Sequence, residues 1–152
     1  MSPRPKRDLA EMRDRLFREV DRVLGAAEKA TPEQLTWKPA ANANTILILA
    51  AHVVGAAERH IVVQVGGHET GGSREQEFVG KTELADIKVR WAKVRQRIAQ
   101  VFDDLPPGRL DDEVPGPLGS QTVHWMFVHA IAHAAEHAGQ AELTREIAEA
   151  RG

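Results

Sequence analysis

The chain has 152 residues, the length of one ordinary globular domain, and its hydrophobic share of 42% and charged share of 28% exclude a disordered polypeptide. Its 20 Lys and Arg residues stand against 22 Asp and Glu residues, and the net charge of -2 provides no basic field to attract a nucleic acid. Cysteine is absent, which excludes disulfides, a thiolate nucleophile and Cys-ligated zinc, so any metal ion would need His, Asp or Glu ligands.

Neither a membrane span nor a secretory signal is expected from the sequence. The longest apolar run covers residues 46 to 57 and is interrupted by His52 and Gly55, whereas a helix that crosses a bilayer needs roughly 20 apolar residues. The first residues are basic and lead into a charged helical pattern without the apolar segment of a signal peptide. We therefore expect one domain over residues 1-152, a cytoplasmic location, and no nucleic-acid or membrane partner.

The N-terminal part of the chain has the pattern of an amphipathic helix. Apolar residues recur at spacings of three or four from position 9 to position 27, which predicts a helix from about residue 8 to residue 30. The dipeptide Thr31-Pro32 predicts the end of this helix, and one short helical turn is expected around residues 33 to 35. An irregular connection follows.

The second predicted helix has no polar face. It begins at Ile46, with Asn44 or Thr45 as the N-cap, and continues to about Val62. Because it is apolar almost all round, we expect it to lie inside the fold.

Two glycine-rich or proline-rich connections flank the third predicted helix. Residues 66 to 81 include five glycines and predict a long loop, which suggests a crossover or a lid. We expect Thr82 to cap a helix whose apolar repeat runs from residue 84 to residue 101 and which stops at Pro106.

The last predicted helix runs from about residue 123 to residue 150, with Ser120 or Thr122 as the N-cap. The chain shows no convincing strand pattern and no internal repeat. Four helices with this periodicity predict an all-α protein, a four-helix bundle with long connections.

Histidines are concentrated in the last helix, which carries four of the seven: His124, His129, His133 and His137. The last three are each four residues apart and therefore share one stripe of the helix. His133 and His137 also fall in the apolar seam that runs through Met126 and Ala130, so we expect them to point inward. Unpaired imidazole nitrogens there would cost about 1–3 kcal/mol each, and a bound metal ion would satisfy them.

A third inward histidine is predicted in the second helix. His52 is flanked by small residues in an otherwise aliphatic element, and small residues also surround His133 and His137. Two ligands at i, i+4 on one helix and a third on a facing helix are a common way to build an ion site in a bundle. Three histidine ligands leave coordination positions open, as in catalytic rather than structural zinc sites.

Three segments resemble the DinB-like (YfiT-like) metalloprotein superfamily: LTWKP at residues 35 to 39, residues 46 to 52, and HAIAHAAEHAGQ at residues 129 to 140. The resemblance covers most of the chain. Trp125 and the sequence LTRE at residues 143 to 146 make it most similar to the actinobacterial mycothiol-enzyme-like branch, in which position 133 is often Glu and position 140 is often His.

The resemblance implies that His52, His133 and His137 bind a divalent metal ion, with Zn²⁺ or Ni²⁺ as the leading choices. Characterised relatives are thiol S-transferases or thiol-dependent isomerases, and relatives are often dimers. The leading hypothesis is therefore a homodimeric, metal-dependent enzyme that transfers a low-molecular-weight thiol onto an electrophile. Arg145 is a candidate for holding a carboxylate of the thiol cosubstrate, or it pairs with Glu142 or Glu146.

The remaining assignments keep further functions open. His129 is a candidate proton donor, a partner of a metal ligand or a cap on the cavity, and it would be the general base if the reaction were metal-assisted hydrolysis. The histidine pattern is also compatible with a non-catalytic metal-binding or ligand-binding stress-response bundle, and with an interaction module that binds no metal. His60, His68 and His124 are expected at the surface or at an interface. The tryptophans are expected to pack, with Trp125 able to border the cavity mouth.

Overall fold

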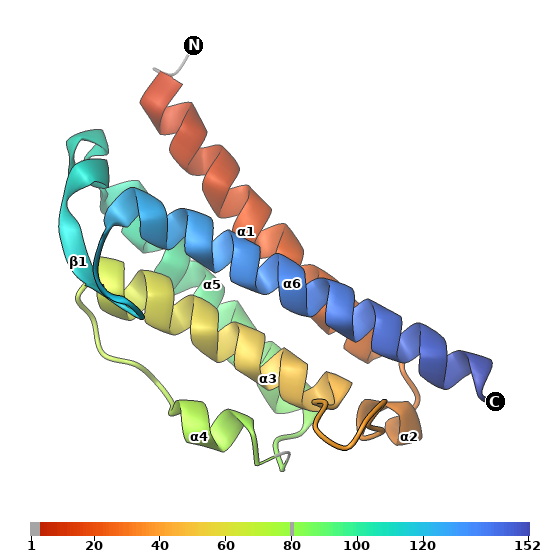
Figure 1. The fold of residues 1–152 in the computed structure, drawn as a ribbon. Helices are drawn as coiled ribbons and strands as arrows, with labels where there is room; N and C mark the ends of the chain where they lie inside the picture. Colours follow the sequence, from red (N-terminus) through yellow and green to blue (C-terminus); the bar gives the residue numbers. More distant parts are fainter. Residues whose placement is uncertain (1–3, 80) are drawn as a thin grey trace.

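The computed structural model describes residues 4–79 and 81–152 and shows the predicted all-α bundle. Four long helical segments form it: α1 (Arg4–Lys29), α3 (Ile46–Ala57) continued by the π-helix η1 (Glu58–Val65), α5 (Leu84–Asp104) and α6 (Val123–Ala150). The connections hold the short helices α2 (Pro32–Leu35) and α4 (Arg74–Glu77), the 3-10 helix η2 (Pro107–Asp111), and the strands β1 (Glu113–Gly116) and β2 (Gly119–Thr122). Figure 1 shows this order along the chain.

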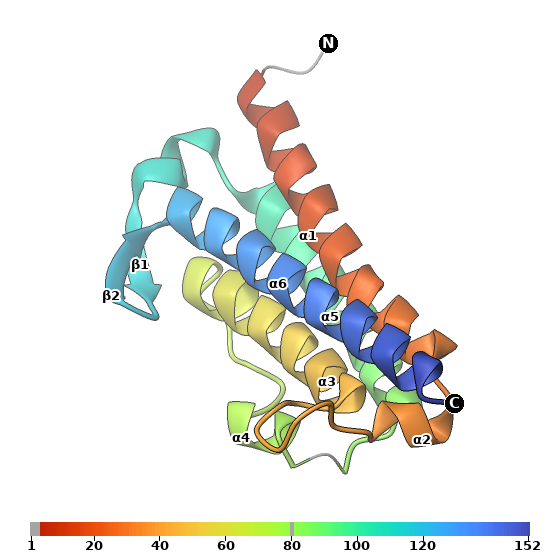
Figure 2. The same cartoon turned by 45° about the vertical axis from the view of Figure 1, so that its right-hand side comes forward.

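The core lies where the four long helices face one another. Figures 1 and 2 show α6 running beside both α1 and α3. Removal of their apolar side chains from water is the main stabilising contribution to such a bundle. The largest fully buried apolar side chains come from all four segments: Leu16, Val20, Ile46, Ile61, Ile98, Met126 and Phe127.

The central helix is longer than the sequence pattern indicated. α3 and η1 form one helical stretch from Ile46 to Val65, and by its 20 residues and mean hydropathy of 1.7 it is long and apolar enough to cross a membrane. However, most of that stretch is buried inside the structure, as in the core helix of a bundle. In α3 every residue except Leu47 is buried, which agrees with the predicted internal position.

Hydroxyl side chains cap four of the described helices: α2 (Thr31), α3 (Thr45), α4 (Ser73) and α6 (Thr122). The Thr45 side chain accepts a hydrogen bond from the backbone N–H of Ile48, and Thr122 does the same for Trp125, so each belongs to the predicted pair of cap candidates. The prediction for α5 was wrong by one residue, because Glu83 occupies the N-cap without a side-chain hydrogen bond, and Thr82 precedes it.

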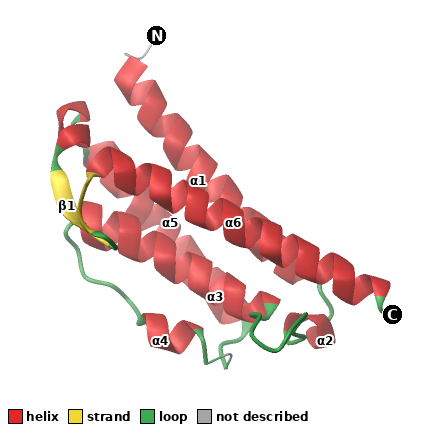
Figure 3. Ribbon diagram, in the orientation of Figure 1, coloured by secondary structure: helices red, strands yellow, loops and turns green. Residues whose placement is uncertain are grey.

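A small β-hairpin precedes α6, although no strand was predicted. β1 and β2 are antiparallel, with Glu113 opposite Thr122, and each strand has four residues. Figure 3 shows the strands at the start of α6. Strands this short, which contain Gly and Pro, cannot display a recognisable alternation of apolar and polar residues. Gly119 begins β2 with φ of +102°, a conformation that favours glycine.

The predicted long loop crosses one face of the bundle and is held to it by hydrogen bonds of charged side chains. We call residues 66 to 79 the strap; it contains α4 and lies along α3 (Figure 1). The carboxylate of Glu58, only 1% exposed, accepts hydrogen bonds from Arg90, Arg97 and the backbone N–H of Gly71. Burial alone would raise the pKa of Glu58, but these bonds outweigh it and lower that pKa.

Candidate metal centre

The three histidines that the sequence grouped together meet between α3 and α6. His52 projects from α3, while His133 and His137 stand one turn apart on α6. The Nε2 atom of His133 lies 3.1 Å from Nε2 of His52 and 3.2 Å from Nε2 of His137. One nitrogen from each residue lies within 4.8 Å of the other two, so the group could hold a metal ion.

All three side chains are shielded from solvent, and this shielding favours the neutral imidazole form of His133 and His137. His52 is 6% exposed, and His133 and His137 are half-buried at the edge of the apolar seam of α6. Burial, with a smaller contribution from His137 and His52, lowers the pKa of His133 to about 3. Burial also lowers the pKa of His137, against the opposing hydrogen bond to Gln140. Neutral imidazole is the form that binds a metal ion.

The spacing of the nitrogens fits a metal ion better than it fits hydrogen bonds alone. A ring nitrogen either donates one proton or accepts one, yet Nε2 of His133 has two nitrogen neighbours at bonding distance. A single proton on that atom would have to be shared between them. In a tetrahedral zinc site with Zn–N bonds of about 2.0–2.1 Å, ligand nitrogens are separated by about 3.3 Å, close to both distances.

The outer ring nitrogens of two of these histidines face oxygen atoms. Nδ1 of His137 lies 2.7 Å from Oε1 of Gln140, and because the amide oxygen only accepts, Nδ1 carries the proton. Nδ1 of His52 is buried without a hydrogen bond and lies 3.6 Å from Oε2 of Glu77. In both residues this arrangement directs Nε2 toward His133.

A second group of aromatic rings continues from the cluster along α6. His129 lies outside the ligand set, with its ring centroid 6.1 Å from that of His133, and it stacks on Trp125 at 4.6 Å. The ring of His60, from η1, contacts His129 at 4.8 Å and His133 at 5.5 Å. Trp125 therefore lies beside the candidate site, whereas the buried Trp91 is a core residue.

The expectation for His60 was wrong. It was placed at the surface or at an interface, but its side chain lies against the cluster, and burial, together with His129, lowers its pKa to about 4. His52, Ala56 and His60 are spaced four residues apart, like the three grouped histidines of α6. This spacing could have placed His60 on the same helix face as His52 from the sequence alone. His68 and His124 are exposed, as expected.

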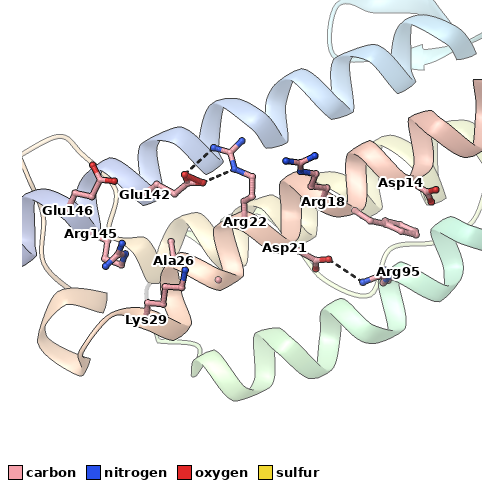
Figure 4. A pocket seen from close by; sticks show the side chains of 12 residues that line it. Asp14, Arg18, Asp21, Arg22, Ala26, Lys29, Arg95, Glu142, Arg145 and Glu146 are labelled. Carbon is pink, nitrogen blue, oxygen red and sulfur yellow. Dashed lines mark hydrogen bonds and ion pairs between the residues drawn. The ribbon is translucent and has the colours of Figure 1, made fainter.

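Arg145 lies on a different face of α6 from the histidine cluster. It lines a groove of about 650 Å³ formed by α1, α5 and α6 (Figure 4). Its guanidinium donates a hydrogen bond to Glu149 at 3.0 Å. In the same groove Arg22 donates two hydrogen bonds to Glu142, which tie α1 to α6 and lower the pKa of Glu142. The partner of Arg145 is thus an acid one turn further along the helix than Glu146 and two turns further than Glu142, the two partners proposed from the sequence.

Comparison with known proteins identifies the family of this bundle. The model of the DinB superfamily matches residues 15–141, a stretch that contains the three converging histidines and most of all four long helices. No curated protein matches the chain significantly. Because the family model covers most of the sequence, the chain belongs to the DinB superfamily.

Proposed function

We propose that this protein is a metal-dependent transferase that moves a low-molecular-weight thiol onto an electrophile. The observation that carries the proposal is the convergence of three imidazoles, which offers a cation three ligands and leaves coordination positions open. A divalent cation there, Zn²⁺ or Ni²⁺, would lower the pKa of a thiol that reaches it and so favour the nucleophilic thiolate. The chain contains no cysteine, so the thiol must be a cosubstrate.

The residues beside the triad supply proton-transfer chemistry. His129 and His60 are neutral at neutral pH because burial lowers the pKa of each. A neutral imidazole can accept the proton that a thiol releases, and the resulting imidazolium can return it to a leaving group. His129 contacts both Trp125 and His60, so its ring is held in place for this role. We assign the proton-transfer role to His129.

The proposal is tested by activity that depends on both metal and thiol. Purified protein loaded with Zn²⁺ or Ni²⁺ is incubated with a generic electrophile and a panel of low-molecular-weight thiols, and thioether formation is followed by mass spectrometry. We expect turnover only when metal and thiol are both present, and loss of turnover in His133→Ala. His124→Ala is the matched control, since His124 lies on α6 and is exposed. Enzyme-dependent appearance of the hydrolysed electrophile in the same spectra without added thiol would contradict transfer and favour hydrolysis.

A further inference from the structure

The strap places two side chains directly against the least exposed histidine of the triad. Glu77, at the end of α4, is 3% exposed, and its Oε2 lies 3.6 Å from Nδ1 of His52. The ring of Phe78 lies 4.9 Å from the ring of His52, and the guanidinium of Arg74 lies over the Phe78 ring. The outer edge of His52 therefore contacts the strap rather than solvent.

Glu77 reaches His52 because the neighbouring positions of the central helix accommodate it. Gly55 is three residues after His52 on the same face, and a Cβ atom there would lie only 1.9 Å from Oε1 of Glu77. Arg59, one turn further on, donates hydrogen bonds to both carboxylate oxygens, the shortest at 2.6 Å. A glycine that leaves the space and an arginine that balances the charge together hold a carboxylate in a buried position.

We propose that Glu77 is a positioning residue for the metal centre. Its carboxylate accepts a hydrogen bond from the Nδ1–H group of His52. This bond fixes the tautomer in which Nε2 is free to bind an ion, and it keeps the ring turned toward His133. Nδ1 is otherwise a buried polar atom without a hydrogen bond, and a shift of a few tenths of an ångström brings Glu77 within bonding distance.

This role couples the strap to metal binding. The strap is held to the bundle by charged contacts at Glu58 and Arg59, and a cavity of about 230 Å³ lies beneath it, lined by both strap and bundle residues. A segment held by a few polar contacts opens more easily than the packed core. Since Glu77 orients a metal ligand only when the strap is closed, a bound ion must in turn stabilise the closed strap.

The direct test is a Zn²⁺ titration by calorimetry, without thiol or electrophile. We expect Glu77→Ala to weaken Zn²⁺ binding about 10- to 100-fold, the range found when a partner of a metal-ligating histidine is removed. Glu75→Ala is the matched control, because Glu75 lies on the same short helix and is exposed. Equal Zn²⁺ affinity in the two variants, with circular dichroism showing both folded, would overturn the inference.

Two readouts on the unmodified chain separate positioning from a merely structural role. Long-range ¹H–¹⁵N spectra of metal-free protein should show His52 protonated at Nδ1, with its signals assigned by their absence in His52→Gln. The opposite tautomer would contradict the inference. Hydrogen exchange of residues 66 to 79 should slow at least threefold when Zn²⁺ binds, and unchanged exchange in protein shown to hold Zn²⁺ would also contradict it.

The inference rests on the metal centre of the proposed function, and the two fail differently. If the wild-type chain binds neither Zn²⁺ nor Ni²⁺, both are wrong. If it binds Zn²⁺ but transfers no thiol, the proposed reaction is wrong, and the titration of Glu77→Ala still decides the role of Glu77.

Discussion

The Nε2 atoms of His52 and His133, which are 81 residues apart in the sequence, lie 3.1 Å apart where α3 meets α6. His52 is directed there by the carboxylate of Glu77, and His137 by the amide of Gln140. His52 and His137 thus present their Nε2 lone pairs toward His133, the first from α3 and the second from α6. A group of this kind, preorganised before an ion arrives, loses little conformational entropy when it binds.

Removal of the central ligand should abolish metal binding. His133 contacts both other histidines, so His133→Ala leaves two ligands that no longer share a neighbour. We expect elemental analysis of purified protein to fall from about one divalent ion per chain, the occupancy of a single three-ligand site, to less than one tenth of that. His68→Ala, an exposed histidine in the strap, should retain the wild-type metal content. Equal metal content in both variants would exclude this centre.

The metal-free protein should lose stability in acid. The pKa is about 4 for His60 and about 3 for His133, below the value of about 6.5 in an unfolded chain. At pH values between the folded-state pKa and the unfolded-state pKa, the unfolded state binds more protons than the folded state. The free energy of unfolding is therefore largest above a pH of about 6.5. It should decrease by up to about 1.4 kcal/mol per pH unit for each histidine as pH falls.

Urea unfolding of chelator-treated protein at pH 7.5, 6 and 5 measures this decrease. His60→Gln is the comparison, because it removes one of the histidines whose pKa is lowered and should reduce the slope by about the contribution of one histidine. The lowered pKa of Glu58 contributes only at lower pH, where carboxylates begin to take up protons. A free energy of unfolding that is constant from pH 7.5 to pH 5 would show that the histidines are not shielded as described.

Features that follow from the helical repeat of residue types were predictable from the sequence. The repeat of apolar residues predicts the four long helices, and for α6 the expected bounds, 123 to 150, agree with the structure. The i, i+4 spacing on α6 predicts that His133 and His137 share a face, and the small, apolar surroundings of His52 predict that it faces inward. These properties depend on near neighbours in the chain.

The features that were not predicted depend on contacts between distant residues. The burial of Glu77 requires Arg59 and the space above Gly55, and neither its polar surroundings in the sequence nor its glycine-rich loop indicates a buried carboxylate. The hairpin that pairs Glu113 with Thr122 could not be predicted either, because its strands are too short to show an alternation of apolar and polar residues. Tertiary context decides both.

Removal of the Glu58 carboxylate should loosen the strap and destabilise the fold. Glu58→Ala breaks contacts with Arg90, Arg97 and the strap backbone at Gly71. Charge-assisted hydrogen bonds contribute about 1.5–3 kcal/mol, and because both arginines are partly exposed and can return to water, we expect a loss of about 2 kcal/mol. Urea unfolding followed by circular dichroism measures it.

The control for this change is an ion pair at the surface. Glu149→Ala removes the partner of Arg145 on an exposed face of α6, where such pairs contribute about 0.2–1 kcal/mol. Proteolysis should also cleave Glu58→Ala faster within residues 66 to 79 than the control. The assignment of Glu58 as an anchor of the strap would be wrong if the two variants had equal stability and equal cleavage rates.

Replacement of His129 should separate catalysis from metal binding. The ring of His129 contacts Trp125 and His60 but lies outside the group of nitrogens that could hold an ion. His129→Gln should therefore retain the metal content of the wild type while the rate of thiol transfer falls about 100-fold, the lower end of the usual effect of a general acid-base group. Because a thiol of lower pKa needs less help in losing its proton, the deficit should shrink across a series of increasingly acidic thiols. A variant that loses its metal would instead place His129 among the ligands, and a uniform deficit for all thiols would assign it to substrate binding.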